Sequence, residues 1–435
     1  MFSKILIANR GEIAVRIIRA CKEMGIATVA VYSEADEGCL HAALADESYC
    51  IGPAEAANSY LHTEHILSVA AMTGAQAIHP GYGFLSENAS FARLCQKNGV
   101  VFIGPSPESM ENLSDKALLK ETMEAAGLQV IPGTKCLTGI QQAKQEAERI
   151  GYPVMLKASS GGGGRGIRKI ETPAELETAY PQAAAEALSA FGDSSLYLEK
   201  YVYPARHIEM QILADEDGNV VCLGERDCSL QRHNQKLIEE TPSPAISPAR
   251  RREIMDKVIH AVKQIGYVGA GTLEFLYDRN DNFWFMEMNV RLQVEHCVTE
   301  MLTGIDLVKW QIRIAAGIPL SFTQDFVKLD GSALECRINA AGCGTLKLLH
   351  VPGGPNVRFD TYLVGGTTVS PYYDSLLGKL VVRAVTREEM LRKMKAALCE
   401  LVVEGIPTNI EEQLRLISDD RFMSGTYDLT FMGGR

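Results

Sequence analysis

The sequence lacks the features that mark secreted, membrane-spanning and zinc-binding proteins. Its start, MFSKILIANRGEIAVR, has no long apolar region and no small-residue cleavage site, which argues against a signal peptide. No apolar run is long enough to cross a bilayer. The 11 cysteines are scattered and form no CxxC pair, which predicts reduced thiols in a cytoplasmic protein and argues against zinc. The net charge of −11 argues against broad nucleic-acid binding.

Strands and helices alternate in the first third of the chain. KILIA (4–8) and TVAVYS (28–33) read as strands, and Gly11–Gly25 as a helix with Ile13, Ile17 and Ile18 on one stripe. This alternation predicts a parallel sheet covered by helices, which we place at about residues 1–113.

Later segments predict a different organisation. From Pro132, helix and strand signals around YPVMLKAS (152–159), IRKI (167–170) and LYLEKYV (196–202) indicate a small α+β unit. Strands then dominate, interrupted by one long helix near Pro248–Ile265, and the tail from about residue 330 mixes strands with helices. The predicted fold class is therefore α/β and α+β, in two or three domains.

The stretch ASSGGGGRGIR (158–168) contains four consecutive glycines, which are costly to order. A dinucleotide-binding fingerprint needs a helix directly after the loop, and a P-loop needs GK followed by Ser or Thr; both are absent. The pattern predicts a strand–loop–strand hairpin, either a loop that closes over phosphates or a solvated hairpin tip. Lys157, in the strand before the glycines, either points at the same volume or snorkels from an edge strand.

The segment GTLEFLYDRNDNFWFMEMN (271–289) reads as a hairpin with two carboxylates. If Asn280 and Asp281 form a two-residue loop, Glu274 lies opposite Glu287, and Asn289 shares the face of Glu287. Carboxylate and amide oxygens suit Mg²⁺, which also uses nucleotide phosphates as ligands. The alternative is a pair of solvated glutamates.

Polar residues also alternate in the segment that follows. In an extended chain Arg291, Gln293 and Glu295 face one way, so Arg291 could bind a small anion and Glu295 could take a proton from it. A structural Arg–Glu pair is the alternative. Two more basic segments supply Arg226, Arg232, His233 and Lys236 in 224–236, and Arg337 in the apolar strand LECRIN (334–339), where a buried arginine needs a carboxylate or a substrate.

At this point the residues are similar to those of the biotin carboxylases of the ATP-grasp superfamily. The motifs are IANRGEIAVRIIRACKEMGI (7–26), HPGYGFLSEN (79–88), SGGGGRGIR (160–168), GERDCSLQR (224–232), EMNVRLQVEHCVTE (287–300), ECRINA (335–340) and PYYDSLLGKL (371–380). They cover nearly the whole chain in the family's order, and HPGYGFLSEN combined with QVEH is specific.

The resemblance implies a reaction and a set of site residues. ATP would phosphorylate bicarbonate to carboxyphosphate, which breaks down to CO₂ and phosphate, and the deprotonated N1′ of biotin would be carboxylated. Mg²⁺ or Mn²⁺ would be held by Glu274 and Glu287, with Asn289 close by. Glu295 would be the base and Arg337 would stabilise the biotin enolate, with Tyr82 nearby. Bicarbonate would contact Lys236, Arg291, Gln293 and Val294. ATP would contact Lys116, Lys157, Gly163, Gly164, Glu199, Lys200, Val202, His207 and Gln231.

The resemblance also implies an organisation and partners. It divides the chain into an N-terminal domain (1–113), an ATP-grasp domain (114–329) with a mobile lid at about 130–202, and a C-terminal domain (330–435). No biotinylation site or carboxyltransferase-sized extension is present, so a biotin carboxyl carrier protein and carboxyltransferase subunits would act in trans. A homodimer without nucleic acid or membrane is expected, in acetyl-CoA carboxylase first and in a pyruvate or propionyl-CoA carboxylase as the alternative.

Some positions depart from the family pattern. Ser160 replaces a glycine, His233 replaces an arginine, and the segment after Ala340 is several residues short. That shortness reflects either a true deletion, which would put the positioning of Arg337 in doubt, or residues missing from the sequence, which we favour. Two other function classes remain: another ATP-grasp ligase acting on a peptide or purine intermediate, and a degenerate binding subunit. The second requires lost chemical groups, and none is lost.

Overall fold

The structure, a computed structural model, describes residues 1–114, 116–159 and 166–433. The N-terminal part is a five-stranded sheet in the order β3-β2-β1-β4-β5, and every pair in it is parallel, as the alternation predicts. Its strands are β1 (Lys4–Ile7), β2 (Ala27–Tyr32), β3 (Glu47–Cys50), β4 (Ala77–His79) and β5 (Val101–Phe102). Its helices are α1 (Gly11–Glu23), α2 (Leu40–Leu44), α3 (Thr63–Thr73), α4 (Ala89–Lys97) and α5 (Pro107–Ser114).

Helix α1 carries the predicted apolar stripe. Ile13, Ile17 and Ile18 are at most 2% exposed, and Cys21 on the same stripe is fully buried. The helix begins directly after β1, so its first turn lies at the carboxyl end of the parallel strands. In open α/β sheets this is the edge where ligands bind.

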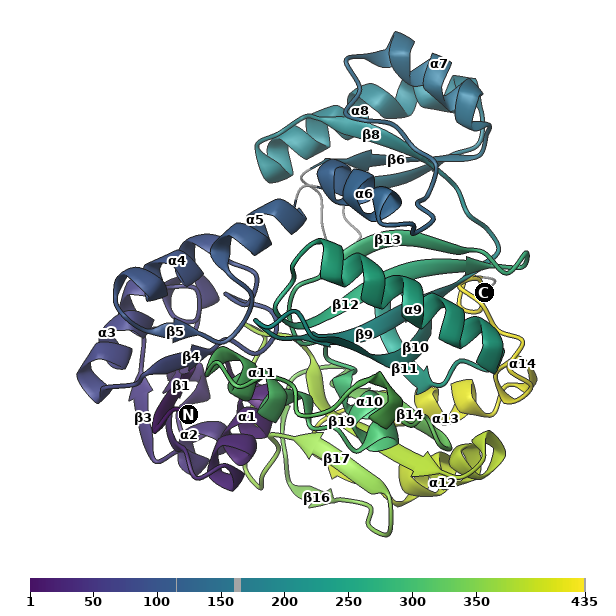
Figure 1. The fold of residues 1–435 in the computed structure, drawn as a ribbon. Coiled ribbons are helices and arrows are strands. Elements are labelled where there is room, and N and C mark those ends of the chain that lie inside the picture. Colours follow the sequence, from purple (N-terminus) through teal and green to yellow (C-terminus); the bar gives the residue numbers. More distant parts are fainter. Residues whose placement is uncertain (115, 160–165, 434–435) are drawn as a thin grey trace.

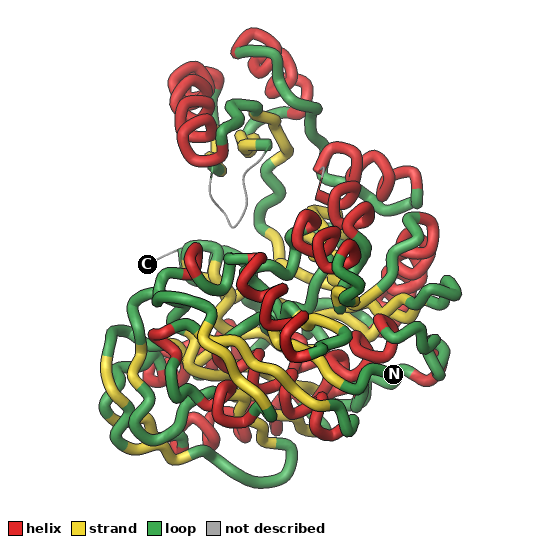
Figure 2. Tube along the Cα trace, turned by 90° about the vertical axis from the view of Figure 1, so that its left-hand side faces the viewer, coloured by secondary structure: helices red, strands yellow, loops and turns green. Residues whose placement is uncertain are grey.

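A small unit over residues 130–202 stands apart from the body of the molecule, above the edge strand β13 (Phe283–Asn289) (Figures 1 and 2). It contains a three-stranded antiparallel sheet in the order β7-β6-β8 and two helices, and its buried side chains form a separate cluster. Its elements are α7 (Ile140–Ile150), β6 (Val154–Ala158), β7 (Ile167–Ile170), α8 (Pro173–Phe191) and β8 (Leu196–Lys200), preceded by α6 (Lys116–Ala125).

Strands β6 and β7 pair antiparallel with Lys157 opposite Ile167, which confirms the predicted strand–loop–strand arrangement. Ser160 and the four consecutive glycines, with Gly163 and Gly164 among them, lie outside the described residues.

The largest element is an eight-stranded antiparallel sheet in the order β13-β12-β9-β10-β11-β14-β19-β17. It runs without a break from the carboxylate hairpin into the C-terminal part of the chain. Its other strands are β9 (Ala205–Ala214), β10 (Val220–Arg232), β11 (Gln235–Thr241), β12 (Gly269–Asp278), β14 (Ser332–Asn339), β17 (Val357–Thr361) and β19 (Leu376–Ala384).

Helices cover this sheet, as Figure 1 shows for α9 and α12. Every residue of the central strand β9 is buried as a result. The helices are α9 (Pro248–Gln264), α10 (His296–Thr303), α11 (Leu307–Ala315), α12 (Arg387–Glu400), α13 (Ile410–Ile417) and α14 (Asp420–Met423), and the short strands are β15 (Gly344–Thr345), β16 (Leu348–His350), β18 (Thr368–Val369) and β20 (Val402–Glu404). No described helix combines the length and apolar character that a membrane crossing requires.

The short segment after Ala340 is held by a backbone hydrogen bond and a strand pairing. The Ala340 amide donates to the carbonyl of Ser375 at 2.8 Å, and β15 pairs with β18. The Arg337 carbonyl accepts from the side chains of Asn409 and Gln413 at 3.0 and 2.8 Å. Arg337 therefore stays anchored in β14.

Candidate active site

A cavity of about 1090 Å³ is lined by residues of the N-terminal part, the small unit and the large sheet. Most of the predicted site residues line it, although they come from segments far apart in the sequence: Tyr82, Lys157, His207, Gln231, Lys236, Glu274, Glu287, Asn289, Arg291, Gln293, Val294, Glu295 and Arg337. One part of the wall is apolar, with Leu276, Met286 and Tyr197. Such a surface suits a planar ring, while the polar residues fix orientation.

The carboxylate hairpin has the predicted pairing but a different turn. Glu274 lies opposite Glu287, as predicted. However, Tyr277 pairs with Phe283, so the turn is one residue longer than the two-residue loop we expected. A bulge between Phe285 and Glu287, where Met286 is the extra residue, then restores the register.

Glu274 is the best-connected carboxylate of the hairpin. It accepts hydrogen bonds from Asn289 at 2.8 Å and Gln293 at 3.0 Å, and His207 Nε2 lies 3.0 Å away. Burial alone would raise the pKa of Glu274, but Lys236 and His207 outweigh it and hold that pKa well below its ordinary value. Glu274 is therefore an anion.

Oxygen ligands for a divalent cation gather at this point. Glu287 is half-buried and lines the cavity beside Glu274. With the Asn289 amide they offer hard oxygen donors on one wall, the donor chemistry that Mg²⁺ prefers. The residues present therefore fit the Mg²⁺ or Mn²⁺ that the resemblance implies.

Lys236 is the central cation. Its ammonium lies 2.6 Å from Glu209, 2.6 Å from Glu295, 3.1 Å from the side-chain oxygen of Gln293 and 3.3 Å from Glu274. Burial would lower the pKa of this lysine, but the surrounding carboxylates raise it well above its ordinary value. Lys236 is therefore a fixed positive charge in the cavity.

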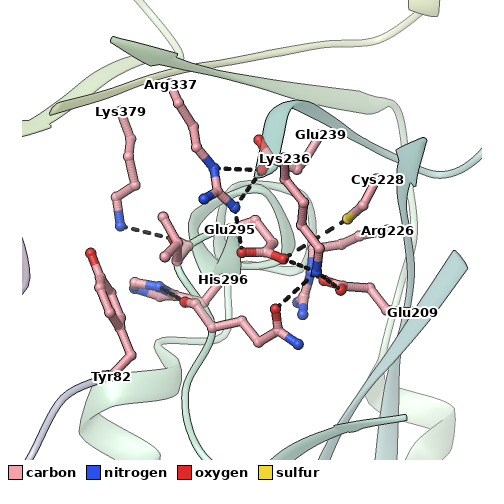
Figure 3. Close-up of polar contacts among 12 residues, drawn as sticks. Tyr82, Glu209, Arg226, Cys228, Lys236, Glu239, Glu295, His296, Arg337 and Lys379 are labelled. Carbon is pink, nitrogen blue, oxygen red and sulfur yellow. Dashed lines mark hydrogen bonds and ion pairs between the residues drawn. The ribbon is translucent and has the colours of Figure 1, made fainter. Parts of the chain in front are cut away.

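Glu295 lies between two cations, Lys236 and Arg337 (Figure 3). Arg337 donates to Glu295 at 2.9 Å and to Glu239 at 2.6 Å. Burial alone would raise the pKa of Glu295, but Lys236 and Arg337 lower it below its ordinary range. The carboxylate is ionised, and it becomes a stronger base once either cation turns to another anion.

The segment that carries these residues is not extended, contrary to our expectation. After β13 the chain runs through a loop and a turn into α10, so strand alternation does not explain why Arg291, Gln293 and Glu295 meet. They meet because the loop wraps around one end of the cavity. Arg291 pairs with Glu87 at 3.1 Å. The structural Arg291–Glu295 pair, which was the alternative to a substrate-binding role, does not form.

Some of the residues predicted to contact ATP do not line the cavity. Lys157 and Lys120 both form ion pairs with the buried Glu199. Lys200 turns away and donates to the carbonyl of Gly151 at 2.6 Å. Lys200 and Val202 do not line the cavity. The side chain of Lys116, like Gly163 and Gly164, lies outside the described residues.

The basic segment 224–236 separates into two roles. Arg226 is fully buried beneath the cavity, where Glu209 and Gln211 accept its hydrogen bonds, and Arg232 pairs with Glu412 at the surface. His233 occupies the turn after β10 with a φ of 49°. Of the four basic residues in this segment, Lys236 alone lines the cavity.

Sequence reasoning missed several charged residues of the site. Glu87, Glu209 and Glu239 pair with Arg291, Lys236 and Arg337 respectively. The fully buried Lys379 pairs with Glu12 at 3.0 Å. Lys379 had a signal, a lysine within the apolar strand LLGKLVV, which is the same kind of signal that identified Arg337.

The fold and the site define an ATP-grasp enzyme. A family model described as the ATP-binding domain of the carbamoyl-phosphate synthase L chain matches residues 115–323. Models of the biotin carboxylase N-terminal and C-terminal domains match residues 1–110 and 335–433. The chain belongs to the biotin carboxylase family of ATP-dependent ligases.

Individual relatives agree with this assignment. Biotin carboxylase 1 of Bacillus subtilis is 49% identical over 442 residues, covering 99% of this chain and 98% of the relative. A Campylobacter jejuni biotin carboxylase–β-γ-ATP complex has a TM-score of 0.97 at 47% identity, covering 100% of this chain and 99% of that one. The biotin carboxylase domain dimer of Hydrogenobacter thermophilus 2-oxoglutarate carboxylase, with MgADP, ADP and bicarbonate, has a TM-score of 0.96 at 47% identity, covering 100% and 97%.

Proposed function

We propose that the protein carboxylates biotin on a carrier protein, using ATP and bicarbonate, through carboxyphosphate. The observation that carries this proposal is the position of Glu295. It is an ionised carboxylate held by Lys236 and Arg337 in a cavity whose other wall carries the Glu274–Glu287 pair. A base, two anion-binding cations and a set of magnesium ligands suit phosphoryl transfer to a small anion.

In the first step a bicarbonate oxygen forms a bond to the γ-phosphorus of ATP. The bond from that phosphorus to the bridging oxygen breaks, ADP leaves, and Glu295 takes the bicarbonate proton. Arg291, Lys236, Gln293 and the Val294 backbone orient the bicarbonate. Arg291 and Lys236 also offset the charge that develops on the transferred group.

In the second step carboxyphosphate divides into CO₂ and phosphate within the closed cavity. The phosphate that is released takes the proton of the biotin N1′, which then forms the new bond to the CO₂ carbon. Arg337 then stabilises the negative charge on the ureido oxygen, and Tyr82 contacts the acceptor. Both intermediates react with or escape into water, so closure is essential.

The remaining roles concern nucleotide and metal. Mg²⁺ or Mn²⁺, held by Glu274, Glu287 and Asn289, neutralises phosphate charge when bound. We assign ATP contacts to Lys116, Lys157, Gly163, Gly164, Glu199, Lys200, Val202, His207 and Gln231. We also propose domain limits of 1–113, 114–329 and 330–435, with residues 130–202 acting as a lid that closes over ATP.

The proposed partners are a biotin carboxyl carrier protein and carboxyltransferase subunits, with the protein itself a homodimer, as the Hydrogenobacter domain is described. We place it in acetyl-CoA carboxylase, with a pyruvate or propionyl-CoA carboxylase as the alternative. A related structure is described as the biotin carboxylase subunit of pyruvate carboxylase, at 48% identity. The eleven free cysteines suit the cytoplasm.

The test is ATP hydrolysis by the purified protein with bicarbonate and free biotin added separately and together. We expect a bicarbonate-dependent rate that biotin stimulates. Glu295→Gln should lower that rate by roughly 10²–10⁴-fold, the usual contribution of a general base. A rate that ignores both additions and rises with an amino acid or amine would instead assign the chain to another ATP-grasp ligase.

A further inference from the structure

A buried ion pair lies at the acceptor end of the cavity, where Glu12 is a lining residue and Lys379 lies behind the wall. Glu12, in the first turn of α1, and Lys379, in the middle of β19, are 4% and 0% exposed, and their charged groups lie 3.0 Å apart. The two residues come from opposite ends of the chain. None of the proposed steps uses either of them.

Each partner holds a polar group that lines the cavity. Glu12 Oε1 accepts the hydrogen bond of the Tyr82 hydroxyl, and the Lys379 ammonium donates to the carbonyl of Val294 at 2.9 Å. The Lys379 ammonium also lies 5.9 Å from the centre of the Tyr82 ring. In Figure 3, Tyr82 and Lys379 lie on one side of Glu295 and Lys236 lies on the other.

The Tyr82 loop rests on the same end of α1. Asn9, two residues before α1 begins at Gly11, donates to the carbonyls of Pro80 and Tyr82 at 2.7 and 2.8 Å. Between them Gly81 has a φ of 65°, and a Cβ there would meet Asn9 Nδ2 at 3.0 Å. The backbone of the loop is thus fixed independently of Glu12, which leaves the phenol as the group that Glu12 controls.

Stability alone does not account for this pair. A buried ion pair gains little over an apolar pair of the same volume, because both charges lose their hydration. Here the compensation is also incomplete, since Glu12 Oε2 has no hydrogen-bond partner among the described residues. What an apolar pair cannot do is hold the Tyr82 hydroxyl and the Val294 carbonyl in fixed directions.

We propose that Glu12 and Lys379 are positioning residues for the acceptor half of the reaction. They link the phenol of Tyr82 to the Val294 backbone, which directly precedes the base Glu295. The distance between these two walls, which would contact the cyclic urea of biotin, is thereby held constant. This inference rests on the proposed biotin carboxylation and adds to it two residues that touch neither nucleotide nor metal ligands.

The test compares the double variant Glu12→Gln/Lys379→Met with the wild type, using free biotin as acceptor. The double variant leaves no unpaired buried charge, so it stays folded where either single variant could fail. We expect the KM for biotin to rise and the biotin-stimulated increment of the rate to fall at least tenfold. The KM for ATP should change less than twofold, and the rate without biotin should fall far less than the rate with it.

Tyr82→Phe provides the coupling test. If Glu12 and Lys379 act through the phenol, adding Tyr82→Phe to the double variant should cause less further loss than Tyr82→Phe causes in the wild type. The matched control is Glu225→Gln/Arg251→Met, which removes another buried pair, 2.8 Å apart, from β10 and α9 outside the cavity. This control should leave the KM for biotin unchanged.

A double variant with normal biotin stimulation, or with equal losses for ATP and biotin, would overturn the inference. Strict additivity with Tyr82→Phe would also overturn it. A wild-type protein without any biotin-stimulated rate is a separate result, because it rejects the proposed function itself.

Discussion

Arg337 is surrounded by more carboxylates than one guanidinium can neutralise. It pairs with Glu239 and Glu295, and Glu335 lies directly opposite Glu239 on the neighbouring strand. Glu239 and Glu335 are fully buried, and neither oxygen of Glu335 has a hydrogen-bond partner among the described residues. Two such carboxyls do not both ionise, so they hold a proton at neutral pH. Burial raises the pKa of Glu239 to about 7 and that of Glu335 well above its ordinary value.

This proton makes the stability depend on pH. Between the ordinary carboxyl pKa of 4.5 and about 7 the folded protein keeps a proton that the unfolded chain has released, so the free energy of unfolding falls as pH rises. Glu335→Gln should flatten this dependence and raise the free energy of unfolding at pH 8 by about 1–3 kcal/mol. Urea unfolding at pH 5 to 8 measures both, with the exposed Glu388→Gln as control. An unchanged slope in Glu335→Gln would show that both carboxyls are ionised.

At the scale of elements, the helix and strand signals of the sequence predict most of the fold. Helix α8 begins after the Thr172 cap, with Pro173 in its first turn, and ends at Gly192 in the left-handed region. The residues at its two ends therefore predict where it begins and ends. The Glu274–Glu287 register is correct for a less direct reason, because the longer turn and the bulge at Met286 cancel. Neither irregularity has a clear sequence signal.

The site was predictable where its residues belong to one segment and less so where it is assembled from several. Glu274, Glu287 and Asn289 follow from one hairpin. Glu87 and Glu12 reach the cavity from other elements, and Glu239 pairs with Arg337 from behind its wall. Their contacts depend on tertiary packing that local patterns do not encode. The resemblance to the family supplied the roles of most other site residues, but it did not identify the carboxylates with which they form ion pairs.

The small unit over residues 130–202 should respond to nucleotide as one body. It has its own buried cluster and contacts β13 through the isolated bridge between Val130 and Phe285. Hydrogen exchange in β6 and β8 should slow on adding a non-hydrolysable ATP analogue, because closure protects their amides.

Lys157→Met should weaken ATP binding about tenfold or more, since it removes one charge-assisted contact. Equal protection in that variant would mean that Lys157 does not contribute to closure.

At the scale of the whole molecule, the large sheet joins two segments that match different family models. Strand β11 belongs to the segment of the ATP-binding model and β14 to that of the C-terminal model, yet they pair directly. Arg337 enters the cavity from β14, and Lys379 of β19 lies buried behind its wall, where it donates to the carbonyl of Val294. The C-terminal part therefore completes both the sheet and the site.

A chain that ends at residue 329 should fail for a structural reason. Removing β14, β19 and β17 exposes β11 as a long unpaired edge, which promotes aggregation. We expect this fragment to be insoluble or to lack a cooperative thermal transition, whereas the full chain unfolds with the large sheet as one unit. Solubility and calorimetry measure the difference. A soluble, cooperatively folding fragment would show that the two parts are independent.

The clamp of Glu295 between Lys236 and Arg337 has a consequence for selectivity against water. When no bicarbonate is present, Lys236, which would orient bicarbonate, and Arg337, which would stabilise the biotin enolate, are both occupied by the protein's own Glu295. A water molecule carries no charge with which to displace Glu295, whereas bicarbonate does. We therefore expect charge to help the site select bicarbonate over water and to limit futile hydrolysis of ATP that is bound in advance of bicarbonate.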